Sequence, residues 1–143
     1  MQLNWWVGVV GTGLMCCAVV APDAHHAFSA EFDANSPVTL RGTVTAVEWI
    51  NPHVWVHIEV TSSDGTVVDW EIEGGAPNAM FRRGWNLNSI PAGIEIVVEG
   101  YQAKNGTTKA NGRTIELPDG RVLFAGSSGT GAPRDGQDPT ERR

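Results

Sequence analysis

The sequence predicts a small all-β domain, an OB-like Greek-key barrel of five to six strands with one short helix between the third and fourth strands. After residue 38, apolar and polar residues alternate along several runs, which is the period of a half-buried strand. The turn-forming pairs Asp64-Gly65 and Asn105-Gly106 separate some of these runs. One stretch near Pro77 breaks the alternation and carries helix signals. A β-sandwich of similar size is the alternative, because strand count alone does not separate the two folds.

The first two strands are expected at residues 38–50 and 53–62, on either side of a turn at Asn51-Pro52. In the first strand, alternate residues from Val38 to Ala46 are expected to face the core, and Gly42 predicts a bulge or bend. In the second strand, alternate residues from Val54 to Val60 face inward. The opposite face then carries Trp55, His57 and Glu59.

The third strand follows the Asp64-Gly65 hairpin turn and covers residues 66–73. Two glycines then interrupt the pattern, Pro77 suits a first helical turn, and Gly84 closes a helix of about two turns. The expected inward residues of the third strand are Val68, Trp70 and Ile72, and the expected outward residues are Asp69, Glu71 and Glu73.

The last strands are expected at residues 94–104, 108–117 and 121–126, separated by the turns at Asn105-Gly106 and Pro118-Asp119-Gly120. Residues 127–143 consist almost entirely of Gly, Pro, Ser, Thr and charged residues. Such a segment buries too little apolar surface to offset its ordering entropy, so we expect a disordered tail after a domain at residues 25–126.

Residues 1–24 are expected to be a secretory signal peptide. An uncharged apolar run covers residues 5–21, and a small residue, Ala24, ends the segment. Export would place the mature protein in the periplasm. An uncleaved membrane anchor is the alternative, although seventeen apolar residues with three glycines are at the short limit for spanning a bilayer.

Composition restricts the chemistry of the mature chain. Both cysteines, Cys16 and Cys17, lie in the export segment, so no disulfide, thiolate nucleophile or cysteine metal site is expected. The full chain carries a formal charge of −6, and loss of Asp23 leaves 10 basic against 15 acidic residues, or −5. An acidic domain repels phosphate backbones, which argues against nucleic acid as a partner. The sequence has no GxSxG nucleophile motif, and no residues indicate catalysis.

Adjacent histidines, His25 and His26, would begin the mature protein. A cut after Ala24 would give His25 an α-amine and a ring nitrogen on one residue, a chelate that suits Cu(II). His53 and His57 share one strand face but lie about 13 Å apart, so His53, at the turn, is the expected partner of His25. The alternative is a plain linker, with His53 as a turn residue whose ring bonds a backbone carbonyl.

A second candidate surface is the outward face with Trp55, His57 and Glu71, where OB-type barrels bind their ligands. Trp55 is expected to pack against Trp49 or the helix; alternatively, the N-terminal arm covers Trp55 and closes the barrel.

Arg82 and Arg83 lie near the glycine-rich helix start, where free N–H groups and two guanidinium groups resemble an anion cradle. The structural alternative pairs one of these arginines with a strand carboxylate, Glu71 or Glu73.

Several motifs occur in one order between residues 25 and 128: HHAF, EFD, NPH, EGGAPN, RRGW and GYQAKNG. In this combination the chain resembles a bacterial family of small exported proteins that is classed as a domain of unknown function. The resemblance implies an exported all-β domain that begins close to the double histidine. It implies no activity.

We therefore expect an exported, non-catalytic binding module that holds copper through His25 with His53 or His26. The alternative is a metal-free module that uses the Trp55/His57 face to bind a small ligand or a periplasmic protein. A third hypothesis, a copper-dependent redox enzyme, would require an open coordination position at the metal.

Overall fold

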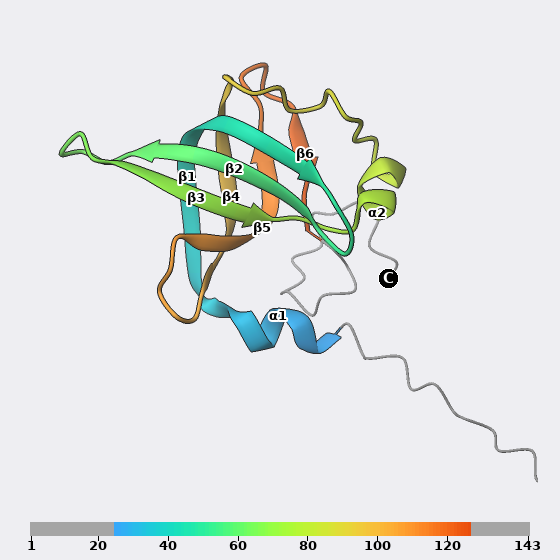
Figure 1. Cartoon of the computed structure of the whole chain (residues 1–143), viewed down its shortest axis with the longest axis horizontal. Helices are drawn as coiled ribbons and strands as arrows, with labels where there is room; N and C mark the ends of the chain where they lie inside the picture. Colours follow the sequence, from blue (N-terminus) through green and yellow to red (C-terminus); the bar gives the residue numbers. More distant parts are fainter. Residues whose placement is uncertain (1–24, 127–143) are drawn as a thin grey trace, which may run out of the picture.

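A computed structural model describes the backbone of residues 25–126 and the side chains from Phe28 onward. The expected signal peptide and the expected disordered tail lie outside the described residues. Within them, no helix is long and apolar enough to cross a membrane. The elements in chain order (Figure 1) are α1 (His25–Glu31), β1 (Phe32–Trp49), β2 (Val54–Thr61), β3 (Val67–Glu73), α2 (Pro77–Arg82), β4 (Glu95–Ala103), β5 (Lys109–Glu116) and β6 (Val122–Phe124).

Five of the six strands close into a ring. The sheet has the order β3-β2-β1-β4-β5-β6, and an additional pairing joins β3 to β5. That closing pair is parallel, whereas the other neighbouring strands are antiparallel. With α2 between β3 and β4, this is the strand order of an OB-like Greek-key fold. The predicted fold class is confirmed, while α1 is a helix that the sequence analysis did not assign.

A bulge in β1 reverses the direction in which its side chains point. The pairing of β1 with β2 slips between Val44 and Ala46, so one extra residue enters β1 at Thr45. The expectation that Ala46 faces the core is wrong, because the slip moves it to the exposed side. Gly42 is not the bulge. Gly42 allows the backbones of β1 and β2 to lie close together, since a Cβ at this position would lie 2.7 Å from the carbonyl oxygen of Glu59.

The inward side chains of the ring form the core, and α2 contributes to it. Met80 of α2 is fully buried, and the following Trp85 is 3% exposed. The Trp85 indole Nε1 donates a hydrogen bond to the carbonyl of Phe124 at 3.1 Å. The fully buried strand residues include Val54, Val56, Ile58, Ile72, Ile96, Val98 and Ile115. Those of β2 and β3 are the ones that the alternation predicts.

A second, smaller apolar cluster holds α1 against the ring. Phe28 and Phe32 are buried, with ring centroids 5.8 Å apart. Phe28 also meets Tyr101 of β4 edge to face at 5.5 Å. In Figure 1, α1 runs along the lower end of the ring. The segment that begins with the backbone of His25 is therefore part of the folded structure.

Candidate functional site

A buried carboxylate lies where the ring closes. The parallel pairing of β3 with β5 places Glu73 beside Asn111. The Asn111 side-chain amide donates a hydrogen bond to Glu73 Oε1 at 3.2 Å. Glu73 is 7% exposed and Asn111 is 2% exposed. Glu73 keeps the predicted outward register, since it pairs with Trp55 across the strands, and it is buried there by other elements instead of by the core.

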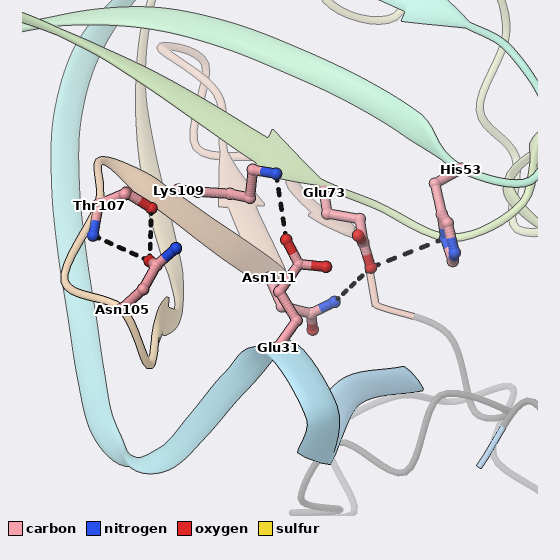
Figure 2. A network of polar contacts seen from close by, with 7 residues as sticks. All are labelled: Glu31, His53, Glu73, Asn105, Thr107, Lys109 and Asn111. Carbon is pink, nitrogen blue, oxygen red and sulfur yellow. Dashed lines mark hydrogen bonds and ion pairs between the residues drawn. The ribbon is translucent and has the colours of Figure 1, made fainter. Parts of the chain in front are cut away.

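His53, in the turn before β2, faces this carboxylate (Figure 2). Its Nδ1 lies 3.1 Å from the carbonyl oxygen of Gly74 and 3.8 Å from Glu73 Oε1. Both neighbours are hydrogen-bond acceptors, so a neutral His53 ring carries its proton on Nδ1. The lone pair is then on Nε2, the nitrogen that remains available to a ligand.

Burial raises the pKa of Glu73, and this is the largest influence on it. The negative charge of Glu31 raises it further, whereas His53, the Asn111 amide and Lys109 act in the opposite direction. Glu73 is thus a carboxyl group whose ionised form is costly in the folded protein, with its strongest electrostatic partner at His53.

Polar contacts tie α1 to the same network. Glu31, the last residue of α1, forms an ion pair with Lys109 at 3.1 Å, and this contact raises the Lys109 pKa. The ammonium group of Lys109 lies over the ring of Trp55, 5.1 Å from the centroid. Lys104 adds hydrogen bonds to the carbonyls of Glu31 and Ser29. Figure 2 shows α1 passing beside Glu73, Asn111 and Lys109.

The structure separates the predicted metal ligands into different surroundings. His25 and His26 form the start of α1, but their side chains lie outside the described residues. His53 belongs to the Glu73 network, whereas His57 faces Glu48, with Nε2 3.4 Å from its carboxylate. No group of three or more His, Cys, Asp or Glu residues that could hold a metal occurs within the described part of the chain.

The aromatic residues of the predicted ligand surface face different ways. Trp49 pairs with the inward-facing Val54 and stacks on Phe81 of α2, with centroids 4.9 Å apart. Trp55 lies on the opposite face, under Lys109. The expectation that Trp55 packs on Trp49 is therefore wrong, because β1 and β2 pair in a register that points the two indoles apart.

The charged residues of that surface are also dispersed. Glu71 is exposed, pairs with His57 across the strands and acts electrostatically on Lys109. Arg82 ends α2, so it lies about 7.5 Å along the helix from Pro77. Arg83 follows and donates a hydrogen bond to the carbonyl of Gly126. The two arginines are thus at the opposite end of α2 from the proposed anion cradle.

Sequence reasoning missed the roles of Glu73, Asn111 and Lys109, which come from two strands distant in the chain. A signal was present for Glu73, which directly precedes the glycine pair that ends the alternation of β3. Strand ends of this kind often carry functional groups, but the partner strand cannot be read from the local pattern.

Comparison with known proteins agrees with the resemblance noted from the motifs. A search of curated proteins gives no significant match. The model of a family of unknown function, DUF6152, matches residues 13–112, which is more than half of the chain. This protein therefore belongs to the DUF6152 family.

Proposed function

We propose that the protein is an exported, non-catalytic binding module that holds one copper ion between the start of α1 and the β1–β2 turn. The α-amine and imidazole of His25 would supply two nitrogens, and His53 Nε2 would supply the third. Cu(II) favours nitrogen ligands in such a tetragonal arrangement.

The observation that carries this proposal is the hydrogen bonding of His53. Its Nδ1 faces the Gly74 carbonyl and the Glu73 carboxylate. A turn histidine that binds no metal makes the same contact with a backbone carbonyl. A histidine that binds a metal through one ring nitrogen almost always donates a hydrogen bond from the other nitrogen to a carboxylate, a backbone carbonyl or water. The contact fixes the tautomer and leaves Nε2 as the ligand, which a metal site requires.

The attachment of α1 supports the pairing of His25 with His53. The Glu31–Lys109 ion pair and the Phe28 cluster hold the end of α1 that follows the histidines. Glu31, at the end of α1, and His53, in the β1–β2 turn, both act electrostatically on Glu73, so the end of α1 and this turn lie near the same carboxylate.

The test is a Cu(II) titration of the exported, processed protein. N-terminal sequencing should return His25 as the first residue. The titration should saturate at one ion per chain, and electron paramagnetic resonance should report nitrogen ligands. Loss of a residue that only supports a metal ligand lowers metal affinity about 10–100-fold. The His53→Ala variant removes a ligand itself, so its affinity for Cu(II) should fall by more than this.

Two controls make this test decisive. The His57→Ala variant should bind as the wild type does, because His57 faces Glu48 instead of the Glu73 network. A protein with one extra residue before His25 should bind weakly, because its terminal amine is displaced from the chelate. Equal affinity of the extended protein and the processed protein would refute the proposal.

A second candidate function uses the outward face of β2 without a metal. The observation that favours it is His57 Nε2, a buried nitrogen that lies 3.4 Å from the Glu48 carboxylate but forms no hydrogen bond within the described residues. Small molecules bound there should shift the NMR signals of Trp55 and His57, and His57→Ala should abolish these shifts. Shifts that cluster around His53 would contradict this candidate.

A further inference from the structure

We infer that Glu73, held in place by Asn111, is a positioning residue for His53. Its carboxylate orients the imidazole from the Nδ1 side and increases the electron density that Nε2 offers to a metal. This inference rests on the proposed function, because it assigns an outer-shell role within the same site.

The geometry assigns Glu73 to the outer shell. Glu73 Oε1 lies 3.8 Å from Nδ1 of His53, the nitrogen that also meets the Gly74 carbonyl. A metal on Nε2 would lie on the other side of the ring from this carboxylate. Glu73 therefore acts on the metal through His53, as in the carboxylate–histidine–metal arrangement of many metalloproteins.

Asn111 fixes the position of the carboxylate. It donates its side-chain hydrogen bond to Oε1, the same oxygen that faces His53. Asn111 is almost completely buried between paired strands, so it cannot follow Glu73 into solvent. The chain of contacts from Asn111 through Glu73 to His53 holds the ring at a defined angle.

Burial of this carboxylate has a cost that folding alone does not explain. A charge removed from water destabilises a protein unless it is fully compensated. Here one amide bonds the carboxylate and the charges of His53 and Lys109 favour its ionised form, but Glu31 repels it and its burial outweighs each of these. A glutamine at position 73 would keep the shape and the acceptor oxygen without the charge, so it should fold at least as well as the native residue.

The experiment compares Glu73→Gln with wild type and with Glu116→Gln, a matched change at an exposed residue on β5. We expect Glu73→Gln to weaken Cu(II) binding about tenfold, the lower end of the range for outer-shell partners, because the Nδ1 contact is long. The nitrogen pattern in electron paramagnetic resonance should remain, the melting temperature should not fall, and Glu116→Gln should bind as wild type does.

The outcomes separate this inference from the proposed function. If Glu73→Gln binds copper as tightly as wild type while His53→Ala does not, the positioning role is refuted and the copper site stands. If wild type shows no His53-dependent binding, the proposed function fails and this inference fails with it. A measurement on the metal-free protein is independent of any variant: ¹⁵N NMR should find the His53 proton on Nδ1, and a proton on Nε2 would overturn the inference.

Discussion

Gly100 leaves the least room for a Cβ among the glycines that the structure describes, and its substitution tests how β4 and β5 fit together. A Cβ at Gly100 would lie 2.2 Å from the carbonyl oxygen of Asn111 and 3.2 Å from the Cα of Gly112. Ordinary carbon–oxygen contacts begin near about 3.3 Å, so Gly100→Ala must move backbone by about 1 Å. The obstructing atom belongs to β5, which is paired with β3, β4 and β6 and cannot move alone.

We expect Gly100→Ala to lower the free energy of unfolding by about 2 kcal/mol, within the usual range of about 1–3 kcal/mol for overpacking. At about 4–8 °C per kcal/mol for a domain of this size, the melting temperature should fall by about 8–16 °C. Circular dichroism during thermal and urea unfolding measures both quantities.

The matched control is Gly126→Ala. A Cβ at Gly126 would have its nearest neighbour at 3.5 Å, which is an ordinary contact. This variant should stay within about 0.5 kcal/mol of wild type. If Gly100→Ala is as stable as Gly126→Ala, the close approach of β4 and β5 is not what requires glycine, and the reasoning is refuted.

Three further predictions concern α1, the core and the buried carboxylate. Phe28→Ala removes the aromatic contacts of α1, so hydrogen exchange should accelerate in α1 while the ring strands keep their protection; uniform loss of protection would contradict this. Trp85→Phe leaves the Phe124 carbonyl without its indole donor and should cost about 1–3 kcal/mol in urea unfolding, whereas unchanged stability would show that the bond contributes little. Because burial raises the pKa of Glu73, this carboxyl group ionises first in the unfolded chain, and its contribution to the stability of wild type should fall as pH rises from 4.5 to the raised folded value. Glu73→Gln lacks this loss, so its stability relative to wild type should increase across that interval and then level off; a constant difference in urea melts would count against the raised pKa.

The strands could be predicted from the sequence because their signals are local. In β2, alternation correctly places Val54, Val56 and Ile58 inside and Trp55 and His57 outside. The turn at Gly65 and the short helix at Pro77 depend on the backbone preferences of single residues. The bulge at Thr45 was missed because an inserted residue changes the pairing without a distinctive sequence.

The candidate site was predicted only in part. His53 was identified from its position at the turn, and its ring contact with a carbonyl was one of the expected alternatives. The partner carboxylate was expected only to face away from the core or to pair with an arginine, since Glu73 has the outward register of β3. That register is correct, but Glu31 of α1 and Asn111 of β5 lie against this part of the face. An N-terminal arm over Trp55 was one of the expected alternatives, whereas the contact with β5 was not expected.

The sequence by itself determined the all-β class, the strand order along the chain and the family, because periodicity, turn residues and motifs are properties of neighbouring positions. Only the tertiary structure decided which residues form the polar network. Glu73 meets Asn111, 38 positions away, and Lys109 meets Glu31, 78 positions away. These pairs exist because β3 pairs with β5 to close the ring and α1 packs beside this pair of strands. Such long-range pairing has no local signature in the sequence.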